Sequence, residues 1–117
     1  MDDITRPIDR LLSIMATLRD PTHGCDWDRA QNFASIVPHT IEEAYEVADA
    51  VARGDHAEIC DELGDLLFQV VFQSRIAEED GLFDFEDVAR AIADKLEAKR
   101  RARFRTAMAP PPFPPMP

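Results

Sequence analysis

The sequence predicts an all-α protein, an antiparallel four-helix bundle-like domain that oligomerises. Apolar residues recur at the three- and four-residue spacing of helices, and no stretch shows the alternation of a half-buried strand. A chain of 117 residues is long enough for one core, which assembly with other copies would help to bury. We expect a helical domain over residues 1–106 and a proline-rich tail over 107–117, which holds six of the nine prolines.

The first half of the chain predicts two helices and an irregular connection. The first helix is expected over residues 7–19, where one apolar stripe contains Ile8, Leu11, Leu12, Met15 and Leu18. An irregular stretch should follow from Asp20, with a short helical turn over residues 31–36 before Pro38. The second helix is expected to begin near Thr40. Thr40 and Glu43 fit a capping box, which would give Glu43 a purely structural role.

Two further helices are expected in the second half. Gly54 should end the second helix, and Asp55 should cap the third, which runs to about Glu79. The later part of the third helix is apolar nearly all round, more than one small domain can readily enclose. We therefore expect a subunit interface there, formed by Phe68, Val71, Phe72 and Ile76. The fourth helix is expected to begin at Asp84.

Composition excludes several classes of partner. A net charge of −10 argues against binding to a nucleic-acid backbone or to an anionic membrane surface. No apolar run approaches the roughly 18 residues of a membrane span, and the N-terminus lacks a signal-peptide pattern. Two cysteines are too few for a zinc site. These features predict a cytoplasmic protein.

Two matched acid pairs are the strongest indication of function. Glu43 and Glu46 are three residues apart, as are Glu62 and Asp65, so each pair lies on one face of its helix. Residues 31–74 contain nine acids and one strong base, Arg53. Crowded carboxylates without a nearby cation need a counter-ion, and oxygen ligands favour Mg²⁺, with Mn²⁺ as a possible substitute.

The spacing around the turn supports convergence of the two pairs. Glu46 lies eight residues before Gly54 and Glu62 lies eight residues after it, so the pairs should be level across a helical hairpin. On the third helix, one stripe along the edge of the apolar face contains Glu58, Glu62, Asp65 and Gln69. Gly64, within that stripe, is expected to permit a close approach. For any single glutamate, an ordinary exposed surface charge stays the alternative.

The residues also resemble a known family. Glu42-Glu43-Ala-Tyr-Glu46 followed by Glu62-Leu-Gly-Asp65 resembles the EExxE…ExxD motif of the all-α nucleotide pyrophosphohydrolases, and the MazG family is the most similar branch. The segment from Ile14 to Gln31, residues 61–71 and residues 81–85 are also similar to that family.

The resemblance implies an activity and a set of roles. The activity is Mg²⁺-dependent hydrolysis of nucleoside triphosphates (NTP or dNTP) to the monophosphate and pyrophosphate, by a homodimer or homotetramer. The implied metal ligands are Glu43, Glu46, Glu62 and Asp65, with Glu42 as a supporting catalytic carboxylate. The implied substrate-binding residues are Trp27, Gln31, Lys95 and Lys99.

Two departures from the family pattern leave alternatives open. Cys25-Asp-Trp-Asp28 replaces the usual Cys-Pro-Trp-Asp, and the basic run after Leu96 differs from the family's phosphate-contacting end. The second hypothesis is therefore a non-catalytic module that binds nucleotide or drives oligomerisation. Trp27 could equally be a core or interface aromatic, and the two lysines could be solvated surface charges.

Overall fold

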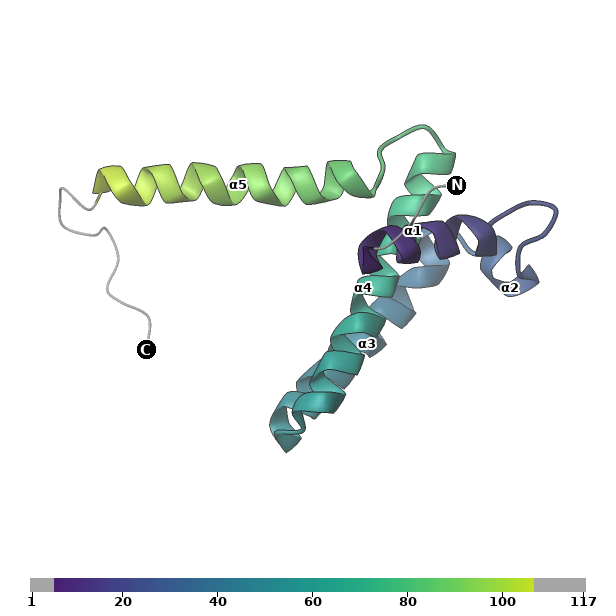
Figure 1. The fold of residues 1–117 in the computed structure, drawn as a ribbon, viewed down its shortest axis with the longest axis horizontal. Helices are drawn as coiled ribbons and strands as arrows, with labels where there is room; N and C mark the ends of the chain where they lie inside the picture. Colours follow the sequence, from purple (N-terminus) through teal and green to yellow (C-terminus); the bar gives the residue numbers. More distant parts are fainter. Residues whose placement is uncertain (1–5, 107–117) are drawn as a thin grey trace. The chain divides into compact units, whose positions relative to one another are not determined.

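The computed structural model describes residues 6–106, and within that range it contains five helices and no strand (Figure 1). They are α1 (Pro7–Leu18), α2 (Asp26–Arg29), α3 (Phe33–Arg53), α4 (His56–Glu79) and α5 (Phe85–Thr106). The predicted all-α class is confirmed. None of these helices is both long enough and apolar enough to cross a membrane. The predicted proline-rich tail lies outside the described residues.

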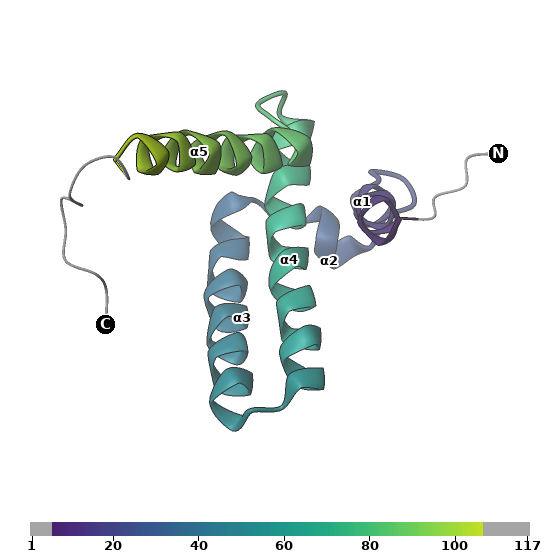
Figure 2. The same cartoon turned by 60° about the vertical axis from the view of Figure 1, so that its left-hand side comes forward.

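A helical hairpin of α3 and α4 is the central feature, and Figure 2 shows the two helices side by side and antiparallel. Gly54 ends α3 in the left-handed conformation, with φ of 71°. The Asp55 side chain then caps α4 by accepting a hydrogen bond of 3.1 Å from the backbone N–H of Glu58. The predicted turn is confirmed, since both of its signals are local.

The start of α3 differs from the prediction. Asn32 caps the helix in a reciprocal box with Ser35, with hydrogen bonds of 2.8 and 2.9 Å. Pro38 is enclosed within the same helix, so the predicted break before it and the predicted start near Thr40 are wrong. The Thr40 hydroxyl donates to the Ile36 carbonyl from inside the helix. The Thr40–Glu43 capping box does not form, and Glu43 has no such structural role.

The core of the hairpin unit is formed within one chain. The buried residues are Met15 from α1, Ile36 from α3, and Val71, Phe72 and Ile76 from α4, each at most 4% exposed. Phe68 packs partly buried against them. The prediction that Val71, Phe72 and Ile76 form a subunit interface is therefore wrong, whereas the same prediction for the partly buried Phe68 stays a prediction. The segment is apolar nearly all round because α1 and α3 both cover it.

The connection between α1 and α2 is a compact loop closed by backbone contacts. Gly24 N–H donates to the Asp20 carbonyl at 2.8 Å, and Cys25 N–H donates to the Leu18 carbonyl at 3.0 Å. A Cβ at Gly24 would lie 2.4 Å from the Leu18 carbonyl oxygen, so only glycine fits this close approach. The stretch predicted to be irregular contains α2, which is too short to show periodicity.

The chain divides into two compact units at the start of α5. The described residues up to Phe85 form the first unit, and those from Glu86 belong to the second. The second unit is the body of α5, with Glu86 and Asp87 in its first turn and Arg103 and Arg105 in its last. This order of charges matches the helix dipole and stabilises the helix. The start of α5 agrees with the predicted start at Asp84 to within one residue.

Candidate metal centre

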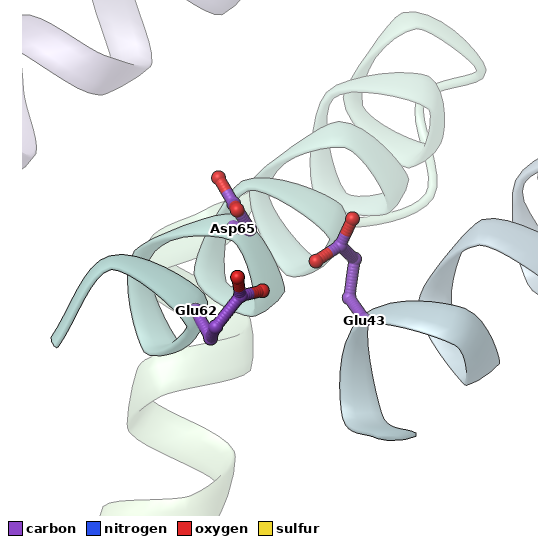
Figure 3. A group of neighbouring side chains, drawn as sticks. All are labelled: Glu43, Glu62 and Asp65. Atoms are coloured by element: carbon purple, nitrogen blue, oxygen red, sulfur yellow. The ribbon is translucent and has the colours of Figure 1, made fainter. Parts of the chain in front are cut away.

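Three carboxylates converge between α3 and α4. Glu43, Glu62 and Asp65 each offer one oxygen, and these three atoms lie within 4.8 Å of one another. Figure 3 shows Glu43 reaching from α3 toward Glu62 and Asp65, which come from neighbouring turns of α4. The three-residue spacing on α4 puts the latter two on one face, and the antiparallel hairpin brings Glu43 opposite them.

The cluster raises the pKa of two of its members. The pKa of Glu43 is raised by desolvation first, and then by the charges of Asp65, Glu42 and Glu46, although a hydrogen bond with Glu62 opposes the rise. The pKa of Glu62 is raised by desolvation and then by Asp65, Glu46, Glu43 and Glu58. Glu43 Oε2 is buried and has no hydrogen-bond partner among the described residues. The metal-free cluster is therefore electrostatically strained.

The nearest strong base in the sequence, Arg53, is engaged elsewhere. Arg53 pairs with Asp49 and with Glu58 at the closed end of the hairpin. Within residues 6–106, no basic side chain forms an ion pair with Glu43, Glu62 or Asp65. Glu58, predicted to belong to the acidic stripe, is paired with Arg53, although its charge still raises the pKa of Glu62. No basic side chain of the described residues therefore balances the charge of the three carboxylates, so a bound cation would have to do so.

The predicted ligand set is brought together in part. Glu46 lies outside the group of three converging oxygens and is exposed, although its charge acts on both Glu43 and Glu62. Glu42 is also exposed, and its charge acts on Glu43. These two side chains surround the cluster electrostatically without joining it.

The donor chemistry fits a hard divalent cation. Three carboxylates from one hairpin, of which Glu43 also has a buried oxygen without a partner among the described residues, match the ligands that Mg²⁺ and Mn²⁺ prefer. Three protein ligands also leave coordination positions for water and for phosphate oxygens. Sulfur and nitrogen ligands are absent from this group of three, which disfavours zinc.

Trp27 lies on α2 beside two aromatic side chains of the hairpin. Its ring meets His39 edge-on at 5.4 Å between centroids and Phe72 edge-on at 6.2 Å. Trp27 is 50% exposed, and we call its exposed part the open side of the residue. Gln31 donates from Nε2 to the Trp27 carbonyl at 2.9 Å, which fixes the segment rather than leaving the amide free.

His39 was not singled out from the sequence, although it bears on the site. It lies four residues before Glu43 on α3, so it is on the same face one turn away. Its contact with Trp27 places the aromatic group close to the acidic face of α3. The four-residue spacing between His39 and Glu43 was the available signal, but a single histidine on a helix is weak evidence.

Gln69 and Gly64 are the two further residues of α4 that the sequence associated with the acidic stripe. Gln69 is one turn beyond Asp65 and is only 8% exposed, and its Oε1 atom has no hydrogen-bond partner among the described residues. Gly64 was expected to permit a close approach. A Cβ there would meet no atom of the described chain within 4 Å, so that expectation is wrong within one chain.

Lys95 and Lys99 belong to the second unit. They lie four residues apart on α5, and both are exposed. This spacing allows the two ammonium groups to address one anionic group.

The chain is similar to several curated proteins. The family model described as the MazG nucleotide pyrophosphohydrolase domain matches residues 31–104. The chain is 56% identical over 102 residues to the nucleoside triphosphate pyrophosphohydrolase of Escherichia coli K12, covering 87% of this chain and 39% of that protein. It is 47% identical over 88 residues to the nucleoside triphosphate pyrophosphohydrolase/pyrophosphatase MazG of Thermotoga maritima, covering 75% of this chain and 34% of that protein.

A mycobacterial relative also matches most of this chain, but at lower identity. The nucleoside triphosphate pyrophosphohydrolase of Mycolicibacterium smegmatis is 38% identical over 93 residues, covering 78% of this chain and 29% of that protein. The chain therefore spans about two fifths or less of the length of these three relatives.

Proposed function

The chain belongs to the MazG nucleotide pyrophosphohydrolase domain family, a family of hydrolases, and from this premise we propose that it is a Mg²⁺-dependent nucleoside triphosphate pyrophosphohydrolase. Its reaction would be the hydrolysis of NTP or dNTP, with one water, to NMP or dNMP and pyrophosphate. The observation that carries the proposal is the convergence of Glu43, Glu62 and Asp65, which form no ion pair with a basic side chain among the described residues. Removal of unwanted nucleotides from the cytoplasmic pool is the role that suits this reaction.

The proposed ligands of the metal are Glu43, Glu62 and Asp65. Bound Mg²⁺, or Mn²⁺ in its place, would neutralise phosphate charge and would make a bound water more acidic, so that this water could act as the nucleophile. Glu46 lies outside the group of three, and its proposed role is that of a further ligand once the metal binds. The proposed role of Glu42 is to orient the attacking water. The pKa of Glu43 is raised by desolvation first and then by the neighbouring charges, and cation binding would relieve the repulsion from those charges.

Substrate contacts are proposed at both ends of the nucleotide. The open side of Trp27 suits stacking of a base, because aromatic faces bind planar rings with little entropy loss. Gln31 would assist by holding the backbone at Trp27. Lys95 and Lys99 are proposed to meet the phosphates from α5.

Assembly is proposed through an apolar face of the hairpin. The exposed apolar residues spaced along α3 are Val37, Ile41 and Tyr45, and those along α4 are Leu63, Leu67 and Val70. Ile41 is 53% and Tyr45 is 73% exposed, which is unusual for adjacent turns of one helix face. Two such hairpins packed face to face would form an antiparallel four-helix bundle, as a homodimer or as half of a homotetramer.

The proposal is tested by pyrophosphate release from a panel of NTPs and dNTPs, with and without Mg²⁺. Glu43→Gln, Glu62→Gln and Asp65→Asn should each abolish release, because each removes a charged ligand while keeping the side-chain shape. Asp61→Asn is the matched control, since Asp61 is exposed on α4 outside the cluster. Wild-type turnover in two of the three cluster variants would disprove the site.

A second candidate, the non-catalytic nucleotide-binding or oligomerisation module, is favoured by one observation. The basic run after Leu96 differs from the pattern that the resemblance leads us to expect, although the family model matches through residue 104. Nucleotide binding in the presence of Mg²⁺, with no pyrophosphate release from any member of the panel, would favour this alternative.

A further inference from the structure

Arg19, the residue that ends α1, is almost completely buried although it is charged. Its side chain is 7% exposed. From Nη1 it donates to two backbone carbonyls, those of Asp28 at 2.6 Å and Gln31 at 2.9 Å. From Nε and Nη2 it donates to the two carboxylate oxygens of Glu79, at 3.0 and 2.6 Å. One guanidinium therefore joins the segment carrying Trp27 to the end of α4.

The same guanidinium shares an aromatic neighbour with Trp27. The central carbon of the Arg19 guanidinium lies 5.6 Å from the centroid of the Phe72 ring. The Trp27 ring meets that Phe72 ring edge-on at 6.2 Å. Phe72 is fully buried and belongs to the core. Arg19 and Trp27 thus contact the same buried ring, so a shift of Arg19 is transmitted to Trp27 through Phe72.

The segment needs such support because α2 is short. A helix of four residues has few hydrogen bonds of its own, and its last carbonyls receive only long backbone contacts of 3.2–3.4 Å, from the N–H groups of Ala30 and Gln31. A cation placed at those carbonyls satisfies them and also interacts favourably with the end of the helix. The fork of an arginine can serve two carbonyls and a carboxylate at the same time, whereas a lysine carries three donors on a single nitrogen and cannot span them.

We propose that Arg19, held by Glu79, is a positioning residue for the nucleotide-binding segment. It fixes the open side of Trp27 and thereby sets the affinity for nucleotide, without touching the nucleotide or the metal. This rests on the proposed function for the role of Trp27, while the link between Arg19 and the position of Trp27 rests on the hydrogen bonds alone.

The experiment compares Arg19→Lys with Arg29→Lys in the full chain. Arg29 is the matched control, because it is on the same segment but, among residues 6–106, donates to the nearby Pro21 carbonyl and Asp26 and not to α4. Trp27 is the only tryptophan of the sequence, so its fluorescence reports this position directly. In Arg19→Lys, acrylamide quenching of Trp27 should increase and KM for the triphosphate should rise about tenfold, with kcat close to wild type. Arg29→Lys should leave both quantities near wild type.

A second variant, Glu79→Gln, keeps the proposal testable if Arg19→Lys does not fold. Glu79→Gln keeps Arg19 and its two carbonyl contacts but removes the charge that holds the guanidinium, so the same two changes should appear at smaller size. The melting shift caused by Mg²⁺ without nucleotide should be unchanged in both variants, because neither residue is a ligand.

The outcomes separate this proposal from the proposed function. Trp27 quenching in Arg19→Lys and Glu79→Gln equal to that in Arg29→Lys overturns the positioning role, whether or not the chain is active. If the wild-type chain releases no pyrophosphate, the proposed reaction fails, and Trp27-detected binding of ATP with Mg²⁺ replaces KM as the readout. Equal ATP affinity in wild type and Arg19→Lys then overturns the proposal.

Discussion

Arg53 and Glu58 are joined by two hydrogen bonds across the turn between α3 and α4, and the Nη2–Oε1 distance is 2.7 Å. The pKa of Glu58 is lowered, chiefly by the hydrogen bond from Arg53. The pairing closes the hairpin at its tip. It also keeps the one strong base of residues 31–74 away from the three converging carboxylates.

Arg53→Gln should strengthen Mg²⁺ binding and slightly lower the melting temperature. Glu58 loses its partner, and its charge, which already acts on Glu62, adds to the negative potential at the cluster. Calorimetric titration with Mg²⁺ measures the affinity. Arg90→Gln, which removes an exposed arginine paired with Glu86 and Asp87 on α5, is the control. Weaker Mg²⁺ binding in Arg53→Gln than in Arg90→Gln would contradict the prediction.

Glu62→Gln should stabilise the metal-free protein at neutral pH. Because the folded-state pKa of Glu62 lies above its ordinary value of 4.5, its ionised form costs folding free energy at pH 7. That cost disappears as the pH falls through the raised pKa, so the advantage of Glu62→Gln should shrink toward pH 4.5. Urea unfolding from pH 7 to pH 4.5, in a chelator, measures the difference. An advantage that does not depend on pH would show that the raised pKa of Glu62, caused by desolvation first and then by the neighbouring charges, is not its cause.

Mg²⁺ should raise the melting temperature of the wild-type chain. A ligand that binds only the folded state stabilises it by mass action, by about 2.7 kcal/mol at a hundred times its Kd. Asp65→Asn should abolish the shift, and Asp61→Asn should retain it. A thermal melt that is the same in chelator and in Mg²⁺ would remove the support for a metal site.

Ile41→Glu should reduce the oligomeric state. A charge in the middle of the exposed apolar stripe of α3 would be desolvated in the proposed hairpin-to-hairpin contact. Sedimentation velocity at micromolar concentration measures the assembly, and Ser13→Glu on the exposed side of α1 is the control. A wild-type chain that sediments as a stable monomer would show that this face has no partner of its own kind.

Loss of both Lys95 and Lys99 should weaken nucleotide binding by tenfold or more, since a hydrogen bond to a charged group contributes about 1.5–3 kcal/mol. The double Lys→Ala variant should still show the Mg²⁺-induced melting shift without nucleotide, because the lysines are proposed to meet phosphate and not metal. Equal affinity in the double variant and the wild type would move the phosphate contact to Arg100, Arg101 or Arg103.

Local signals explain what the sequence predicted well. The left-handed Gly54 and the capping Asp55 act within a few residues, so the turn could be placed from the sequence. The register across that turn then brings Glu43 level with Glu62 and Asp65, because both arms are regular helices. Glu46 shows the limit of this reasoning. Periodicity gives a face of α3, but it does not say which of two neighbouring turns lies closest to α4.

Non-local packing explains what the sequence did not predict. Pro38 is a strong breaker signal, yet α3 continues through it, with the Asn32–Ser35 box starting the helix and Ile36 buried in the core. From the sequence, we expect a second chain to cover the apolar surface around Phe72. The sequence does not show that Met15 and Ile36 of the same chain cover Phe72. Arg19 gave no periodic signal because its partners are nine, twelve and sixty residues away.

Gly64 lies inside α4 between Glu62 and Asp65, with open space where a side chain would be. A glycine there lowers helix stability by about 1 kcal/mol relative to alanine, which raises the population of locally opened backbone roughly fivefold. Amide hydrogen exchange should therefore be faster over residues 62–65 than over the covered turns around Phe72. The two α4 carboxylates of the cluster thus stand on a turn that glycine makes easier to open, where their spacing can adjust as a cation is taken up or released.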